Sequence, residues 1–157
     1  MLNLIGTYEC KSDAKGRLML PNALKKQMAA VIQDGFVLKR SVFHSCLELY
    51  PMQEWNLMMT DVNKLNRFVK KNNDFIRLFT AGVKVVDLDA LGRLLIPKDL
   101  SAFSGISKEV VLTTTVGIIE IWDKDKYELA INDAAVDFPV LAEEVMGNAT
   151  TAQDGIS

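Results

Sequence analysis

Two segments of nine residues in this 157-residue chain are close copies of each other. Residues 13–21 are Asp-Ala-Lys-Gly-Arg-Leu-Met-Leu-Pro, and residues 89–97 are Asp-Ala-Leu-Gly-Arg-Leu-Leu-Ile-Pro. A second related pair follows in the same order, Leu-Glu-Leu-Tyr at residues 47–50 and Ile-Glu-Ile-Trp at residues 119–122. Two signals that recur in the same order and at nearly the same spacing indicate an internally duplicated fold.

Each copy has the pattern of two strands, a helix and two more strands. In the first copy, strand-forming residues lie on both sides of a turn that contains Gly16, and a helical pattern extends from Ala23 to Ile32. Two further apolar segments, at residues 36–39 and 46–50, predict the third and fourth strands. The second copy repeats this order, so each unit is predicted to be β-β-α-β-β.

The duplication divides the chain into five predicted parts. Helical spacing of apolar residues fills the segments after each copy, and the last residues of the chain are small and polar. The predicted parts are a first unit at 5–51, linker helices at 52–80, a second unit at 81–123, a C-terminal helical region at 124–147 and a disordered tail at 148–157.

These units predict an α+β protein in which the two copies share one core. A single β-β-α-β-β unit has too few residues to bury a core of its own. Two units whose hairpins interleave would form a small β-barrel with fewer open strand edges, and the helices would then be peripheral. Because both units belong to one chain, this pairing is intramolecular.

Composition limits the classes to which the protein can belong. Apolar residues make up 49% of the chain, enough for a buried core, but no run of about 18 apolar residues could span a membrane. The N-terminal sequence lacks the basic flank and apolar core of a secretory signal. The two cysteines, Cys10 and Cys46, form no Cys-x-x-Cys pair and predict reduced thiols. We therefore expect a cytoplasmic protein with no membrane contact.

The formal net charge of −2 conceals an uneven distribution of charge. Residues 1–84 carry 13 Lys and Arg against 7 Asp and Glu, a net charge of +6. Residues 85–157 carry 5 against 13, a net charge of −8. The basic half can bind phosphate, and basic and acidic halves can attract head to tail between subunits. The split can also be incidental.

The turns of the repeated segment carry the candidate functional residues. Arg17 and Arg93 each begin the strand that leaves a glycine turn, and an arginine can contact guanine O6 and N7, or a phosphate, through two hydrogen bonds. Lys11 and Lys15 flank the first turn and suit phosphates. The residues predicted to shape the turns are Asp13, Gly16, Asp89 and Gly92.

A purely structural role explains the same motif equally well. The aspartate would then cap the turn, the glycine would permit it, and the arginine would pair with the aspartate. Both roles are compatible, since a shaped turn can present the arginine. Leu91 occupies the position that Lys15 has in the first copy, so the two turns cannot bind a ligand identically.

Catalytic chemistry has little support in the sequence. His44 is the single histidine, and no Ser-His-Asp, Cys-His or zinc-ligand spacing is present. The glycine-rich phosphate loops of nucleotide-binding proteins are also missing. We therefore expect no enzymatic activity, no catalytic residue, no metal, no cofactor and no small-molecule substrate.

Three segments in this order make the chain similar to the MraZ family of bacterial regulators, which is related to the AbrB-type swapped-hairpin transcription factors. They are the two nine-residue copies and residues 46–55, Cys-Leu-Glu-Leu-Tyr-Pro-Met-Gln-Glu-Trp. Gly-Thr-Tyr at residues 6–8 is also similar to the family, and the resemblance extends over residues 4–145. The chain differs at Cys10 and Lys11, where a His or Asn is common, and in a slightly longer N-terminus.

The resemblance implies an AbrB-like, swapped-hairpin, double-psi-type β-barrel. It also implies a ring-shaped homo-oligomer that binds tandem short G-rich promoter repeats in double-stranded DNA. Such a ring acts on the nucleoid, mainly as a repressor of a division and cell-wall operon. The DNA-binding arginine of the family carries over to Arg17 and its repeat to Arg93, and the basic residues near the first turn carry over to Lys11 and Lys15.

A ring suits this function physically. One subunit on one repeat would bind weakly, because it neutralises few phosphates. Several subunits at fixed spacing would make the second contact at a high effective concentration. The ring therefore predicts a high oligomer in solution.

Two other classes of function fit parts of the pattern. The oligomer could be a protein-interaction scaffold, with the acidic second half as its docking surface and DNA binding incidental. An enzyme on a small barrel would need a pocket with convergent polar groups. If Arg17→Ala left the affinity for duplex DNA unchanged, the result would favour the protein-interaction scaffold.

Overall fold

The computed structural model describes residues 2–147, and the predicted disordered tail lies outside the described residues. The chain divides into a first compact unit that ends at Lys124 and a second that begins at Asp125. Both copies of the repeated segment belong to the first unit. Within the described part of the chain, no helix is both long enough and apolar enough to cross a membrane.

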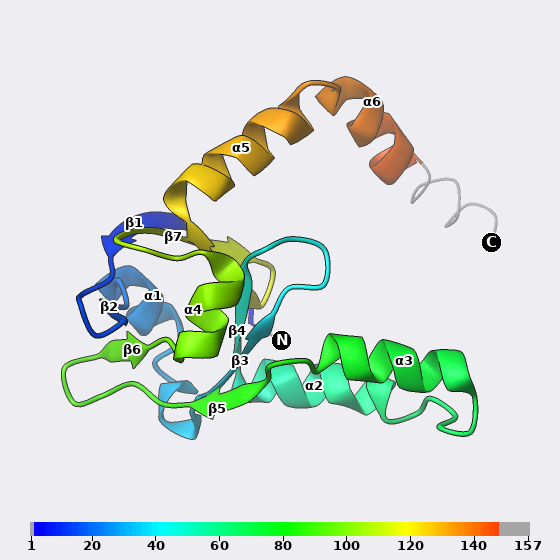
Figure 1. Ribbon diagram of the computed structural model, residues 1–157, viewed down its shortest axis with the longest axis horizontal. Coiled ribbons are helices and arrows are strands. Elements are labelled where there is room, and N and C mark those ends of the chain that lie inside the picture. Colours follow the sequence, from blue (N-terminus) through cyan, green and yellow to red (C-terminus); the bar gives the residue numbers. More distant parts are fainter. Residues whose placement is uncertain (1, 148–157) are drawn as a thin grey trace. The chain divides into compact units, whose positions relative to one another are not determined.

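Both copies have the predicted order of strands and helix (Figure 1). The first copy consists of β1 (Thr7–Lys11), β2 (Arg17–Met19), α1 (Asn22–Gln27), a 3₁₀ turn (Ile32–Asp34), β3 (Phe36–Arg40) and β4 (Leu47–Pro51). The second copy consists of β5 (Lys84–Val86), β6 (Arg93–Leu95), α4 (Lys98–Ser104), β7 (Glu109–Thr115) and β8 (Ile118–Asp123).

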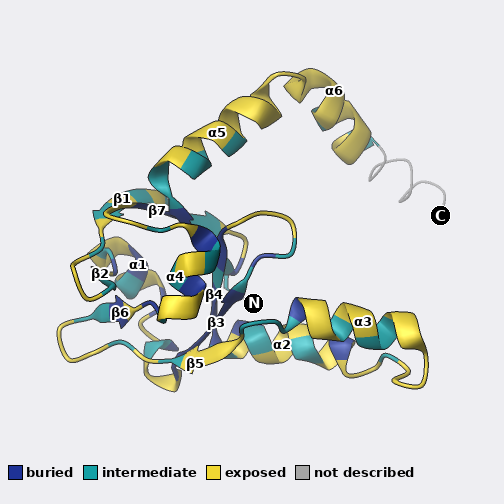
Figure 2. Ribbon diagram, in the orientation of Figure 1, coloured by how far each residue is buried: buried dark blue, intermediate teal, exposed yellow. Residues whose placement is uncertain are grey.

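Helices fill the segments after each copy. Between the copies lie α2 (Met52–Val62) and α3 (Lys70–Phe79). After the second copy come α5 (Lys124–Ala135), α6 (Phe138–Ala142) and a π-helical turn (Glu143–Gly147). Figure 2 shows that buried residues gather along the strands of the first unit, whereas α5 and α6 contain none.

The first helix is shorter than its sequence pattern predicts. We expected it to continue to Ile32, but α1 ends at Gln27. Bonds of the tighter 3₁₀ type replace α-helical ones, since the Val31 N–H donates to the Met28 carbonyl and the Asp34 N–H to the Val31 carbonyl. These turns lead the chain into β3, and Met28 and Val31 stay buried.

The strands of the two copies pair mainly with each other. The large sheet has six strands in the order β1-β7-β8-β4-β3-β5, and β2 pairs with β6 in a separate two-stranded sheet. The first strand of each copy therefore pairs with the third strand of the other, in the β1–β7 and β3–β5 ladders. The two fourth strands also pair, in the β4–β8 ladder, and every ladder is antiparallel.

One apolar core contains side chains from both copies. Leucines from β2 and α1 of the first copy pack with their equivalents from β6 and α4 of the second. Neither copy encloses this core alone, as the small size of each unit predicts. The fully buried members from these four elements are Leu18, Leu24, Leu94 and Leu100.

The α2–α3 hairpin packs against β3 and β4 through aromatic rings. Trp55 of α2 meets Tyr50 edge to face, with ring centroids 5.4 Å apart. It also stacks on Phe79 of α3 at 5.9 Å. The ammonium group of Lys39, from β3, lies 4.5 Å from the centroid of the Phe79 ring. Phe79, the last residue of α3, therefore lies against the buried ammonium group of Lys39.

Candidate nucleic-acid interface

The turn between β1 and β2 is built around the carboxylate of Asp13. The backbone N–H groups of Lys15 and Arg17 donate to Asp13 Oδ1 at 2.9 Å, and Arg17 Nε donates to Oδ2 at 2.8 Å. Gly16 has φ +82°, in the left-handed region that favours glycine, and its N–H donates to the Asp13 carbonyl at 3.0 Å. These bonds fix both the turn and the inner end of the Arg17 guanidinium.

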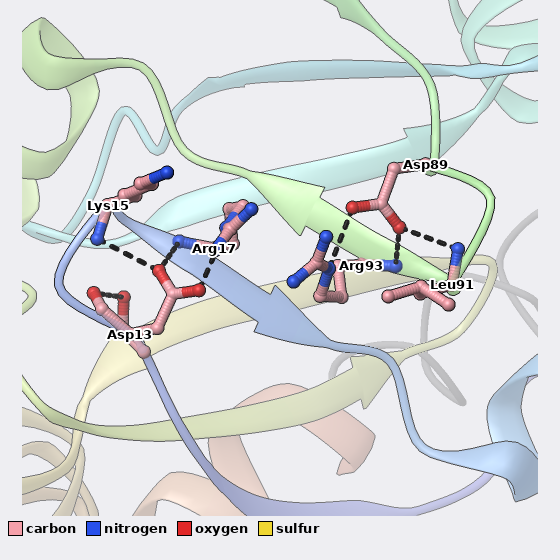
Figure 3. Close-up of polar contacts among 7 residues, drawn as sticks. Asp13, Lys15, Arg17, Asp89, Leu91 and Arg93 are labelled. Atoms are coloured by element: carbon pink, nitrogen blue, oxygen red, sulfur yellow. Dashed lines mark hydrogen bonds and ion pairs between the residues drawn. The ribbon is translucent and has the colours of Figure 1, made fainter.

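The turn between β5 and β6 has the same geometry (Figure 3). The N–H groups of Leu91 and Arg93 donate to Asp89 Oδ1 at 3.0 and 2.9 Å, and Arg93 Nε donates to Oδ2 at 2.7 Å. Gly92 also has φ +82°. In both turns the aspartate accepts backbone N–H groups, the glycine has a positive φ and the arginine pairs with the aspartate. The structure gives Leu91 and Lys15 equivalent places.

The pairing of β2 with β6 brings the two arginines onto one narrow ribbon. Its register places Arg17 opposite Leu95, Leu18 opposite Leu94, and Met19 opposite Arg93. Residues opposite each other in a ladder share a face of the sheet. Leu18 and Leu94 point into the core, so the opposite face of the ribbon carries the two arginines, whose side chains are 29% and 27% exposed.

The turns and the ribbon are also joined to each other. The Gly16 carbonyl accepts the Ile96 N–H at 2.9 Å, and the Gly92 carbonyl accepts the Leu20 N–H at 3.3 Å. Each glycine turn is therefore held by the strand of the other copy. The relative position of Arg17 and Arg93 is consequently set by backbone hydrogen bonds rather than by flexible side chains.

The predicted lysines occupy two different places. Lys15 is an exposed residue of the first turn and belongs to the same surface as Arg17. Lys11 is the last residue of β1 and pairs with Glu109 across the large sheet, so its charge has an acidic neighbour. The structure thus brings Arg17, Arg93 and Lys15 together and leaves Lys11 on a separate sheet.

From the sequence, Lys25 of α1 could be a phosphate contact or part of a solvated helix face, and the structure makes it a basic neighbour of the second turn. A Cβ at Gly92 would lie only 2.6 Å from Lys25 Nζ, so this lysine extends across the turn of the other copy. Its Nζ also lies 3.9 Å from the sulfur of Met19. Local sequence cannot place Lys25 beside residue 92, because the contact depends on the pairing of β2 with β6.

The arrangement can bind an anion or a nucleic-acid base edge. Since Nε of each arginine is engaged by its aspartate, the two terminal nitrogens remain for bidentate contact with guanine or phosphate. A two-stranded antiparallel ribbon is also one of the elements that the major groove of B-DNA admits. The exposed face of β2–β6 therefore offers hydrogen-bond donors on an element that a major groove can admit.

The described residues lack what a metal site or a reactive cysteine requires. Within residues 2–147, no cluster of three or more His, Cys, Asp or Glu side chains could hold a metal ion. Burial raises the pKa of the Cys10 thiol to about 11, and burial raises the pKa of Cys46 to about 12. At neutral pH both thiols are protonated, and neither is activated as a nucleophile.

The hydrogen bonds of both turns favour the ionised form of their aspartates. The pKa of Asp13 is lowered chiefly by the hydrogen bond from the backbone N–H of Arg17; burial opposes this, and the Arg17 guanidinium and the Lys15 N–H lower the pKa further. The pKa of Asp89 is lowered in the same way by Arg93 and Leu91. The ionised aspartate therefore stabilises the folded turn. This stabilisation is fully present when the pH is above the pKa of the aspartate in the unfolded chain, and it is lost as the pH falls through the lower pKa of the folded turn.

We expect a carboxyl-carbon NMR titration of Asp13 to show a midpoint below the usual range of aspartate. In Arg17→Ala the midpoint should rise only part of the way, because the guanidinium is lost while the backbone N–H of residue 17 still donates. Arg93→Ala is the matched control and should leave the Asp13 midpoint unchanged. A midpoint in the usual range for the wild type would contradict this geometry.

Comparison with known proteins agrees with the duplication and assigns the family. The family model of the MraZ protein matches residues 4–78 and again residues 79–144. The transcriptional regulator MraZ of Flavobacterium psychrophilum is 66% identical over 157 residues, which cover all of both chains. That of Christiangramia forsetii is 69% identical over 148 residues, 94% of this chain and 96% of that protein. The chain belongs to the MraZ family.

More distant MraZ relatives match over nearly the same length. The transcriptional regulator MraZ of Clostridium tetani is 32% identical over 141 residues, 90% of this chain and 95% of that protein. Each of the two MraZ matches includes one Asp-x-x-Gly-Arg turn and one strand of the β2–β6 ribbon. In this MraZ chain the ribbon is therefore assembled from one element of each matched half.

Proposed function

We propose that this protein is a sequence-specific, DNA-binding transcriptional regulator and that the β2–β6 ribbon is its contact with the major groove. The observation that carries the proposal is the pairing of β2 with β6, which places Arg17 and Arg93 on one exposed face. Membership of the MraZ family and the names of its relatives as transcriptional regulators support the same function. Lys15 and Lys25 would bind flanking phosphates.

We further propose a ring-shaped homo-oligomer that binds tandem G-rich repeats and represses a division and cell-wall operon, in the cytoplasm and on the nucleoid. The cross-paired strands would then form the AbrB-like, double-psi-type barrel that the resemblance implies. A ring would place several ribbons at fixed spacing, and it would compensate for the few phosphates that one ribbon can neutralise.

The test is fluorescence anisotropy with labelled duplexes that carry one or two G-rich repeats, and with a shuffled duplex, at two salt concentrations. The wild type should prefer the repeats and should bind two of them more tightly than one. Arg17→Ala should lose about 1–3 kcal/mol of this preference, because a bidentate contact with guanine disappears. Arg17→Lys should lose a similar amount, since lysine keeps the charge but not the planar fork.

Arg77→Ala is the matched control for the loss of one arginine. Arg77 lies on α3 with a side chain that is 78% exposed, and it is not part of the ribbon. This variant should keep the preference of the wild type for the repeats. Equal binding of all duplexes by the wild type and Arg17→Ala would contradict the regulator and favour the scaffold. Sedimentation as a monomer at micromolar concentration would contradict the ring.

A further inference from the structure

The DNA-facing ribbon carries two exposed apolar side chains as well as its two arginines. Met19 is 45% exposed and Leu95 is 55% exposed, although their neighbours Leu18 and Leu94 are buried. Single exposed apolar residues are common on protein surfaces. These two, however, follow the arginines at the same distance in both copies of the repeated segment, so the ribbon has an equivalent apolar position in each copy.

The register of the ribbon places each apolar side chain beside an arginine. Leu95 lies opposite Arg17, and Met19 lies opposite Arg93. Opposite residues in an antiparallel pair have Cβ atoms about 4.5–5.5 Å apart, roughly one and a half times the rise of about 3.4 Å per base-pair step. A ribbon in the major groove would therefore place an apolar group within about one or two base-pair steps of each guanidinium.

The major groove offers one apolar group that such side chains can contact. Thymine presents its C5-methyl group there, next to the acceptor atoms of a neighbouring guanine. Neither phosphates nor the minor groove offer a comparable methyl group. A face that combines two guanidinium groups with two apolar side chains matches a base sequence that combines guanine with thymine.

The surroundings favour DNA over a second protein as the occupant of this face. Arg17 lies opposite Leu95 and Arg93 opposite Met19, and Lys25 Nζ lies 3.9 Å from the Met19 sulfur. Asp13 and Asp89 each balance one arginine, so the surplus positive charge near the ribbon comes from Lys15 and Lys25, and it suits a polyanion. Two side chains also cover far less area than the roughly 800 Å² per partner of a stable protein interface.

We propose that Met19 and Leu95 contact the C5-methyl groups of thymines adjacent to the contacted guanines, and that they make thymine part of the recognised sequence. This proposal rests on the proposed function, since it requires the ribbon to lie in the major groove. Leu95 serves the base step beside Arg17, and Met19 serves the step beside Arg93. The side chain of Met19 is longer and more flexible than that of Leu95, so it can contact a thymine methyl group over a wider range of positions.

The test replaces single thymines by deoxyuridine in a fluorescein-labelled duplex of tandem G-rich repeats whose guanine runs are flanked by thymines. The replacement removes only the methyl group and keeps every hydrogen-bonding atom of the base. Loss of one buried methyl should weaken binding of the wild type about fourfold at each sensitive position. This measurement uses the unmodified protein, so no variant needs to fold for it to succeed or fail.

Two variants then assign the contacts. Met19→Ala and Leu95→Ala should each bind the thymine and deoxyuridine duplexes alike at one position and keep the discrimination at the other. Met58→Ala and Leu78→Ala are matched controls, because these residues are exposed on α2 and α3, outside the ribbon. Both controls should discriminate as the wild type does.

The outcomes separate the two proposals. Equal binding of thymine and deoxyuridine duplexes by a wild type that still prefers the repeats and depends on Arg17 overturns the methyl contact alone. Discrimination that survives in both Met19→Ala and Leu95→Ala also overturns it. A wild type without any preference for the repeats overturns the proposed function, and the methyl contact with it.

Discussion

Lys39→Met is expected to lower the free energy of unfolding by about 3–5 kcal/mol, the cost of removing one partner from a buried ion pair. The Lys39 side chain has no exposed surface, and its Nζ lies 3.1 Å from Glu48 Oε1. It also donates to the Arg40 carbonyl at 2.6 Å and lies over the Phe79 ring. Methionine has a similar shape but supplies neither the charge nor these hydrogen bonds.

The loss is large because of what lies across the sheet from Glu48. Its partner in β8 is Glu120, so the variant would leave two carboxylates side by side without a cation. Like charges directly opposite in a ladder are destabilising. Adding Glu48→Gln to Lys39→Met removes one of these charges, and the amide oxygen can still accept the Tyr50 hydroxyl. The double variant should therefore recover most of the lost stability.

The measurement is urea unfolding followed by circular dichroism, at one protein concentration because self-association adds to apparent stability. Lys70→Met is the matched control. Lys70 pairs with Asp74 at 2.7 Å, but its side chain is 88% exposed, and exposed pairs contribute about 0–1 kcal/mol. A Lys39→Met variant as stable as this control would show that the buried pair contributes little.

Leu94→Ala and Leu95→Ala should have very different effects, although the two leucines are adjacent. Leu94 is fully buried in the core that both copies share, so its truncation should cost about 2–5 kcal/mol. Leu95 is exposed on the other face of the same strand, and its truncation should change stability by no more than about 0.5 kcal/mol. Leu18→Ala should resemble Leu94→Ala, because these residues are opposite in register.

The same urea titrations measure this contrast, and anisotropy adds a functional consequence. Because Leu94 anchors the ribbon that carries Arg17 and Arg93, Leu94→Ala should weaken both stability and DNA binding. Leu95→Ala should keep stability and alter only the response to thymine. Similar losses of stability in the two variants would mean that the ribbon does not have one buried and one exposed face.

The sequence predicts the order of strands and helices within each unit better than it predicts which strands pair with each other. The repeated segment and its strand and helix patterns give the β-β-α-β-β order of both copies, because these signals are local. The same patterns do not say that β1 pairs with β7 or that β3 pairs with β5, since those ladders join residues far apart in the chain. They also miss the early end of α1, which turn hydrogen bonds determine.

In the candidate site, too, the local features are predictable from the sequence and the contacts between distant segments are not. Asp13, Gly16 and Arg17 are predictable as one turn because they are close in sequence and each has a specific role in it. The proximity of Lys25 to Gly92 is not predictable in this way, because it requires β2 and β6 to be neighbours. The burial of Lys39 is equally hidden, because the sequence Phe-Val-Leu-Lys-Arg does not reveal that Phe79 of α3 lies over the ammonium group of Lys39.

The antiparallel pairing of β2 with β6 gives the ribbon an approximate twofold axis, which has a consequence for its polarity on DNA. If the two strands were identical, the ribbon would fit its DNA site equally well after a rotation of half a turn about this axis. The direction of a DNA repeat could then not determine the direction in which the subunit binds. The two copies here are not identical, since Lys15 corresponds to Leu91 and Lys25 to Ser101. Because both strands are encoded in one chain, such differences can evolve, whereas a homodimer must keep its halves alike. Duplication therefore makes the two ends of the ribbon chemically different, so that the ribbon can bind DNA in one defined direction.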